Sequence, residues 1–61
     1  MKILTQFVYE NRWVPTTKEE ALKLIKEEMP DTDEVATLEY ILSQIKDGKV
    51  VTLGECRFKN G

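Results

Sequence analysis

Residues 48–61, GKVVTLGECRFKNG, decide the fold, because they return the chain to a strand-forming composition after a long helical stretch. Strict alternation would divide four apolar side chains of this segment, those that follow Val50, between two faces of a strand. The four are Val51, Leu53, Cys56 and Phe58. A glycine inside an apolar run is typical of a bulge, and a bulge at Gly54 would shift the phase. We therefore expect all four side chains on one side of a sheet.

Residues 2–9, KILTQFVY, form the other clear strand candidate and are rich in β-branched and aromatic residues. One face of this strand carries Ile3, Thr5, Phe7 and Tyr9, and the other carries Leu4, Gln6 and Val8. We expect the strand to lie centrally and to pair with the last strand. A hairpin turn at Glu10–Asn11 would lead into a short strand over residues 12–14, ending at Pro15 because proline suits strand ends and edges.

The first predicted helix starts after Thr16 or Thr17 and ends near Glu28. Each threonine has a glutamate three residues on, which is the spacing of a capping box. Pro30 disfavours helical geometry at the residue before it. The apolar stripe of this helix consists of Ala21, Leu22, Leu24, Ile25 and Met29.

A second predicted helix follows almost at once, with Asp31 or Thr32 as its N-cap and Gly48 just past its end. Its apolar residues recur at three- and four-residue steps, the strongest periodic signal in the chain. They are Val35, Leu38, Ile41, Leu42 and Ile45. Because the connection is short, the two helices should form a helical hairpin.

These elements predict an α+β fold, a single small domain over residues 1–61 with the order β(β)ααβ. The sheet is antiparallel with two or three strands, and the helical hairpin packs on one face of it. Which face the helices cover is left open. Because both faces of residues 2–9 are apolar, we expect one face to stay open for a partner. The alternative is that Tyr9 and Trp13 fold over that face and seal it.

The composition argues against catalysis. The sequence has no histidine, so neither a Ser–His nor a Cys–His pair can form. Cys56 lies in an apolar strand, where a buried structural thiol is expected rather than a nucleophile. The acidic residues at 31–34 lack the glycine and the distal glutamate of a calcium-binding EF-hand loop, and no glycine-rich phosphate loop is present. We expect no enzymatic activity, no metal and no cofactor.

The cysteine content and the hydropathy pattern indicate a compartment. One cysteine cannot form an intramolecular disulfide, whereas secreted domains of this size usually carry several. The apolar runs are too short for a signal peptide or a membrane span. We expect a cytoplasmic protein without a membrane partner.

Charge is distributed unevenly along the chain. The net charge is −2, yet residues 19–39 hold eight acidic and two basic side chains, a local net of −6. The remaining residues hold seven bases and three acids, a net of +4. The sequence therefore predicts an acidic helical part and a mildly basic sheet, an asymmetry that affects partner choice rather than fold.

We expect a non-enzymatic protein-binding module, an accessory regulator or inhibitor of the kind that phages and other mobile elements often encode. Aromatic anchors with a charged rim are the usual form of a binding hot spot. The open sheet face supplies one set of candidate partner-binding residues, and the acidic helix surface supplies another. The first set is Leu4, Val8, Tyr9 and Trp13, and the second is Glu27, Glu28, Asp31 and Glu34.

Three alternatives stay open. Nucleic acid, a less favoured partner, would bind the basic residues near the end of the sheet, with Trp13 or Phe58 stacking on a base. These basic residues are Lys46, Lys49, Arg57 and Lys59. Conversely, the acidic helices would mimic a nucleic acid and occupy a basic cleft. Finally, the uncovered face or an edge strand would pair in a homodimer.

Overall fold

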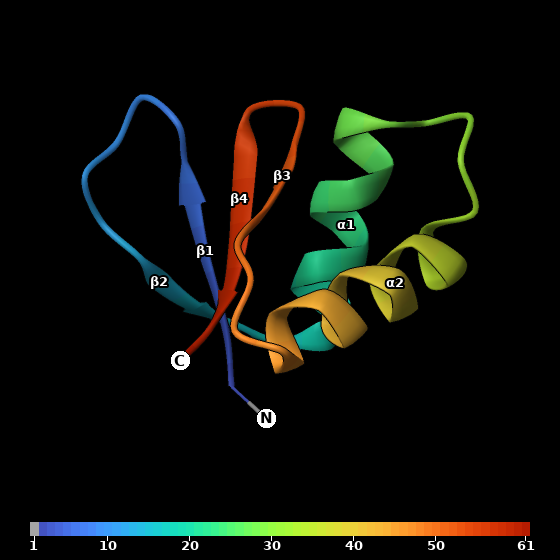
Figure 1. The fold of residues 1–61 in the computed structure, drawn as a ribbon. Helices are drawn as coiled ribbons and strands as arrows, with labels where there is room; N and C mark the ends of the chain where they lie inside the picture. The colour runs from blue at the N-terminus through green and yellow to red at the C-terminus, as the bar shows by residue number, and fades with distance from the viewer. Residues whose placement is uncertain (1) are drawn as a thin grey trace.

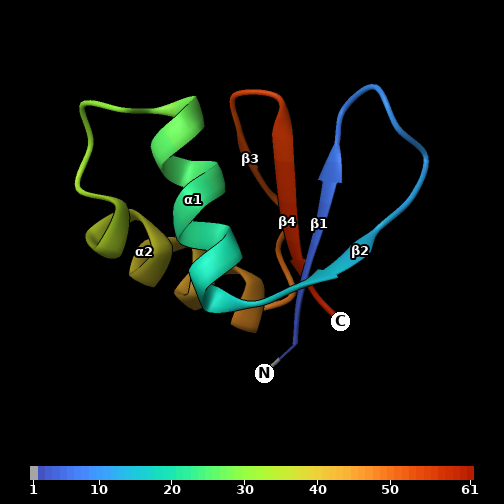
Figure 2. The ribbon, with the colours of Figure 1, turned by 180° about the vertical axis from the view of Figure 1, so that it is seen from behind.

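The computed structural model describes residues 2–61 and has an α+β fold (Figure 1). The elements are β1 (Ile3–Phe7), β2 (Val14–Thr16), α1 (Lys18–Glu28), α2 (Glu34–Lys46), β3 (Val51–Leu53) and β4 (Cys56–Asn60). The strands form one four-stranded sheet in the order β2-β1-β4-β3, in which every neighbouring pair is antiparallel. Both helices lie on the same side of this sheet (Figures 1 and 2). The predicted fold class is confirmed, with more strands than the two or three expected.

β1 is a central strand that pairs with the last strand, as predicted. Its register with β4 runs from Ile3 opposite Asn60 to Phe7 opposite Cys56. The backbone N–H of Gly61 donates to the carbonyl of Lys2 at 2.9 Å and extends this pairing by one bond. The two ends of the described chain therefore lie side by side.

The connection between β1 and β2 differs from the prediction. β1 ends at Phe7, and the N–H of Glu10 donates to the carbonyl of Phe7 at 2.9 Å, which closes a turn over residues 8 and 9. The expected hairpin turn at Glu10–Asn11 is wrong. Such turns demand positive φ, and within residues 2–61 only glycines have it. β2 consequently begins two residues later than expected and contains Pro15, which an edge strand tolerates.

The predicted bulged strand is a hairpin. Gly54 and Glu55 form a two-residue turn between β3 and β4, with a φ of 59° at Gly54. Positive φ at the first position only is the pattern of a type II′ turn, which favours glycine there. The facing pairs are Val51 with Phe58 and Leu53 with Cys56. All four side chains share one face as expected, but they do so because the chain reverses.

Both ends of α1 lie where the sequence predicts them. Thr17 is the N-cap, and its hydroxyl accepts from the N–H of Glu20 at 3.1 Å. The Glu20 carboxylate accepts in return from the N–H of Thr17 at 3.0 Å, which completes the predicted capping box. The helix ends at Glu28, also as predicted.

The start of α2 lies later than predicted. Asp33 is the N-cap, and its carboxylate accepts from the N–H groups of Val35 at 3.0 Å and Ala36 at 3.3 Å. The expected caps, Asp31 and Thr32, belong instead to the turn between the helices, where the N–H of Thr32 donates to a carbonyl at 3.1 Å. The end of α2 is as predicted, with Gly48 at a φ of 85° just after it.

The core lies between the helices and the sheet. Its buried apolar residues are Ile3, Ala21, Ile25, Leu38, Ile41, Ile45, Cys56 and Phe58. The helices therefore cover the face of β1 that carries Ile3. The sequence alone did not indicate which of the two faces they would cover. Val35 is an exception to the predicted stripe, because it is 54% exposed. It belongs to the first turn of α2, which lies far from the sheet (Figure 1).

The position of the α2 cap can be tested with two aspartates two residues apart. Asp33→Ala should lower the free energy of unfolding by about 1 kcal/mol, because it leaves helix N–H groups without an acceptor. Asp31→Ala removes the same charge from an exposed residue and should leave stability within about 0.5 kcal/mol. Urea unfolding followed by circular dichroism measures both. Equal losses would show that the charge, not the cap, matters.

Candidate functional site

The face of the sheet opposite the helices carries a compact set of aromatic and basic side chains. Alternation along β1 places Leu4 and Gln6 on this side, away from the core. The register of β4 places Lys59 opposite Leu4 and Arg57 opposite Gln6. Trp13, just before β2, joins them through its contact with Lys59. We call these five residues the open face.

Lys59 and Trp13 form the central contact of the open face. The Lys59 Nζ lies 4.4 Å from the centroid of the Trp13 ring, which is cation–π geometry. Lys59 belongs to β4 and Trp13 lies beside β2, so the lysine stem crosses the intervening β1 at Leu4. All three side chains are half-buried in consequence. The interaction contributes about 0.5–1 kcal/mol at an exposed site.

A hydrogen bond orders the neighbouring part of the open face. Arg57 Nη1 donates to Gln6 Oε1 at 3.3 Å. Both long side chains are thus held along the sheet instead of extending freely into water. The open face combines one indole, two cations and no carboxylate.

The structure brings together part of the predicted aromatic set. Leu4 and Trp13 share the open face, whereas Val8 lies just past the end of β1, where its N–H donates to the Glu55 carbonyl at 2.9 Å. Tyr9 is 71% exposed and stacks on Phe7, with 5.5 Å between ring centroids. Phe7 belongs by alternation to the helix side, so Tyr9 does not seal the open face.

The nucleic-acid alternative combines the basic residues with Trp13 or Phe58, but it locates them near the end of the sheet. It does not predict that Arg57 and Lys59 lie beside Leu4 and Gln6 on the open face. Their alternation with buried Cys56 and Phe58 was the signal that could have placed them beside Leu4. The expected stacking role of Phe58 is wrong, because that side chain is wholly buried.

The four predicted acidic residues occupy different settings. Glu28 is half-buried, and its carboxylate accepts from the N–H of Glu55 at 2.6 Å, which joins the end of α1 to the β3–β4 turn. Glu27 borders a cleft between α1 and the strands. Asp31 is exposed in the turn between the helices, and Glu34 is the half-buried first residue of α2. Glu28 therefore has a structural contact that the sequence alone did not indicate.

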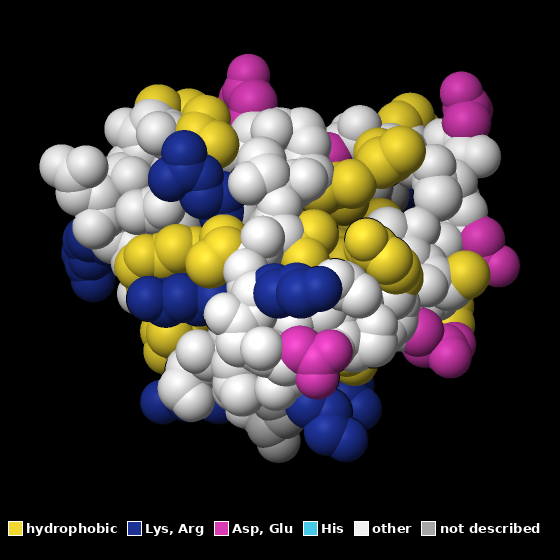
Figure 3. Space-filling model, in the orientation of Figure 1, with side chains coloured by type: hydrophobic (Ala, Val, Ile, Leu, Met, Phe, Trp, Pro, Cys, Tyr) yellow, Lys and Arg dark blue, Asp and Glu magenta, His cyan; other side chains and the backbone are white. Residues whose placement is uncertain are grey.

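The surface charges separate as the sequence predicts. Figure 3 shows Lys and Arg side chains with hydrophobic side chains between them over the strands, on the left of the view. Most of the Asp and Glu side chains visible there lie over the helices. Of the four bases expected near the end of the sheet, Lys46 ends α2 and Lys49 follows it, so only two lie on the open face.

Cys56 is a buried, weakly acidic thiol. Burial, and secondarily the negative charge of Glu28, raises the pKa of Cys56 from 9.0 to about 11. The thiol therefore stays protonated at neutral pH, and a protonated thiol is a poor nucleophile.

Known proteins add no functional information. Neither protein-family models, nor curated proteins, nor solved structures gave a match to this chain. Among residues 2–61, none of the helices combines the length and the apolar character needed to cross a membrane. The function has to be argued from the surfaces described above.

The contact between α1 and the β3–β4 turn can be tested with two glycines. Both Gly48 and Gly54 have positive φ, and alanine in that conformation costs about 1–2 kcal/mol. A Cβ at Gly54 would also collide with the Glu28 carboxylate, whereas the space around Gly48 is open. Gly54→Ala should therefore lose about 1–3 kcal/mol more than Gly48→Ala, because it displaces a charged hydrogen bond. Equal losses in thermal unfolding would contradict this role of Glu28.

The raised pKa of Cys56 predicts a pH dependence of stability. Since the folded chain holds the thiol proton more tightly than the unfolded chain, this stabilisation is complete below pH 9.0 and is lost as the pH rises towards about 11. The loss approaches about 2–3 kcal/mol. Cys56→Ala has no such group, so its free energy of unfolding should fall less between pH 8 and pH 11 in urea titrations. Parallel pH profiles of the two proteins would contradict the prediction.

Proposed function

We propose that this chain is a non-enzymatic protein-binding module that docks its open face onto a partner protein. The observation that carries the proposal is the Trp13–Lys59 contact, which lies on a sheet face that no helix covers. Tryptophan and arginine are the residue types most enriched in binding hot spots, and this face presents both. A module that covers a surface of its partner can block or alter the activity of that partner, and we therefore propose a role as an accessory regulator or inhibitor.

The order of the open face supports binding. Lys59 is held against Trp13, and Arg57 is held by Gln6. Side chains that are already restrained lose less conformational entropy when a partner covers them. The indole would enter an apolar pocket of the partner, and the two cations would form the rim of the interface.

The charge of the open face suggests the chemistry of the partner. Since this face holds two cations and no carboxylate, the matching surface should carry Asp or Glu side chains around its apolar pocket. Most of the acidic side chains visible in Figure 3 lie over the helices, so an acidic partner surface would be repelled if it approached the helices instead of the open face. We propose a cytoplasmic location for this complex, in keeping with the free thiol of Cys56.

Single-stranded nucleic acid is a second candidate partner, favoured by the two cations beside Trp13. Protein is the stronger proposal, because phosphate contacts dominate nucleic-acid affinity. Both cations of the open face already have intramolecular partners, and the chain as a whole carries a net charge of −2.

The proposal is tested by quantitative capture with two aromatic variants. The immobilised chain is incubated with nuclease-treated lysate of its source organism, and captured proteins are quantified by mass spectrometry. Trp13→Ala should reduce capture of the specific partner at least tenfold. Tyr40→Ala removes an aromatic side chain from α2 that is more accessible than Trp13, since Tyr40 is 60% exposed, and should not reduce capture.

Each other result has a distinct meaning. Equal capture by the wild type and Trp13→Ala contradicts docking through the open face. Capture that disappears after nuclease treatment identifies nucleic acid as the partner. Sedimentation of the purified chain covers the remaining alternative, because a dimer that Trp13→Ala dissociates would make the partner a second copy.

A further inference from the structure

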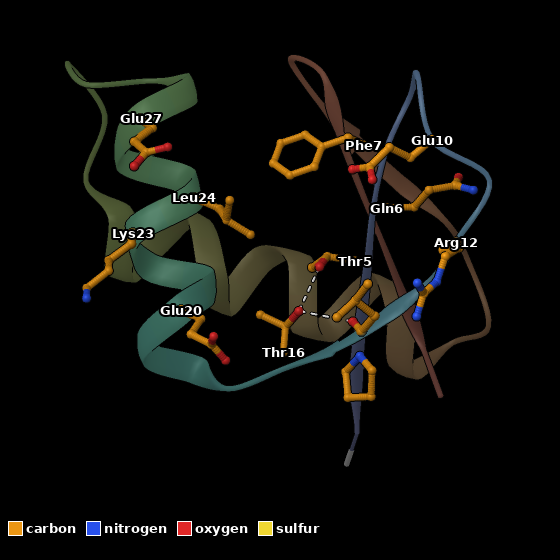
Figure 4. A pocket seen from close by; sticks show the side chains of 12 residues that line it. Thr5, Gln6, Phe7, Glu10, Arg12, Thr16, Glu20, Lys23, Leu24 and Glu27 are labelled. Atoms are coloured by element: carbon orange, nitrogen blue, oxygen red, sulfur yellow. Dashed lines mark hydrogen bonds between the residues drawn. The ribbon is translucent and has the colours of Figure 1, made fainter.

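A cleft of about 420 Å³ lies on the helix side of the sheet, between α1 and the paired strands β1 and β2 (Figure 4). α2 packs against β3 and β4, so the other half of this sheet face is left to α1 alone. Side chains of β1, β2 and α1 line this cleft (Figure 4). The volume is in the range of sites that bind whole small ligands or peptide segments.

Two apolar side chains face each other across the cleft. Leu24 extends from α1 towards the strands, and Phe7 extends from β1 towards the helix (Figure 4). Tyr9 stacks on the Phe7 ring outside the cleft and restrains it. The walls can therefore hold an aliphatic stem or a flat cation.

The two threonine hydroxyls at the floor of the cleft act only as hydrogen-bond acceptors towards a ligand. The hydroxyl of Thr16 donates to the Val14 carbonyl at 3.1 Å. The 2.6 Å bond between the Thr5 and Thr16 hydroxyls must then take its proton from Thr5. Both protons are used within the protein, while Thr5 Oγ1 keeps acceptor capacity towards the cleft. A ligand group bound there has to be a donor.

The charged groups at the rim add further acceptors. Glu20 and Glu27 come from α1, and Glu10 comes from the connection after β1. Hydrogen bonding to Thr17, first through its backbone N–H and then through its side chain, lowers the pKa of Glu20 below its usual value. Lys23, although it borders the cleft, points away from the strands (Figure 4).

Arg12 is the second base that borders the cleft, and its position does not neutralise the glutamates of the rim. It is seen beyond β1, on the side away from α1 (Figure 4). The three glutamates therefore border a space into which neither bordering base extends (Figure 4).

We infer that this cleft binds an arginine side chain of a partner polypeptide, together with an adjacent aliphatic residue. A guanidinium group carries five donors and no acceptor, which matches a floor and rim made of acceptors. It is also planar, so it can pair with a carboxylate through two bonds and lie against the Phe7 ring. Glu20 and Glu27 are seven residues apart on α1, which corresponds to about 10 Å along the helix axis and suits a short peptide segment better than a single small amine.

This site lies on the other side of β1 from most of the open face, because Thr5 and Phe7 alternate with Leu4 and Gln6 along the strand. Gln6 borders both surfaces, and its side-chain oxygen accepts from Arg57 on the open face. The inference needs neither Trp13 nor the open-face partner, and the two proposals can fail independently.

The probe is an acetylated and amidated peptide, Ala-Leu-Arg-Leu-Ala, titrated into the ¹⁵N-labelled chain and followed by NMR. We expect saturable shift changes at amides that line the cleft, Thr5 and Leu24 among them. The same peptide with citrulline in place of arginine keeps the shape without the charge and should bind at least fivefold more weakly. Equal binding of the two peptides, or no saturable binding of either, overturns the inference.

Matched glutamate variants locate the binding site. Glu27→Gln should raise the dissociation constant of the arginine peptide at least threefold, and combination with Glu10→Gln should raise it further. Glu19→Gln changes an exposed glutamate of α1 that does not border the cleft and should leave the constant unchanged. The dispersion of the amide spectrum shows that each variant is folded.

Two further titrations separate the competing explanations. Trp13→Ala should bind the peptide as the wild type does, and a loss there would place the peptide on the open face and overturn the inference. Arginine amide alone should bind at least tenfold more weakly than the peptide. Equal binding would assign the cleft to a free amine instead of a polypeptide.

Discussion

The antiparallel pairing of β1 with β4 is the interaction on which the rest of the molecule depends. It joins the segment before the helices to the segment after them, and it carries Cys56 and Phe58 into the core beside Ile3. Without it the chain would consist of two separate hairpins and two amphipathic helices, and two-stranded hairpins are marginal on their own in water. In a chain that buries only about 60% of its unfolded surface, few other contacts could compensate.

The same pairing gives β1 two sides with different surroundings. Leu4 and Gln6 face the basic, aromatic open face, while Thr5 and Phe7 face the acidic cleft. Two bases gather on the first surface and three glutamates border the second, so the uneven charge of the sequence persists in the folded molecule.

Local signals predicted more of this structure than long-range ones. Helix periodicity and the capping box fixed α1 and most of α2, and the central place of the first strand followed from its two apolar faces. The turn at Gly54 was mistaken for a bulge, because both explain a glycine in an apolar run and only the pairing of β3 with β4 separates them. Asp33 was missed among several neighbouring residues that are equally able to cap a helix. At the site, the Glu28–Glu55 hydrogen bond and the Trp13–Lys59 contact join residues far apart in sequence, and no local pattern contains them.

The strand order has a consequence for how the protein acquires its structure in the cell. β4 is synthesised after every other element, yet it occupies an interior position between β1 and β3. On the ribosome, β1 and β2 can form only a two-stranded ribbon, and the helices have an incomplete sheet to cover. The sheet of these four strands is therefore completed only after β4 has left the ribosome, and until then the apolar side of β1 lacks its cover.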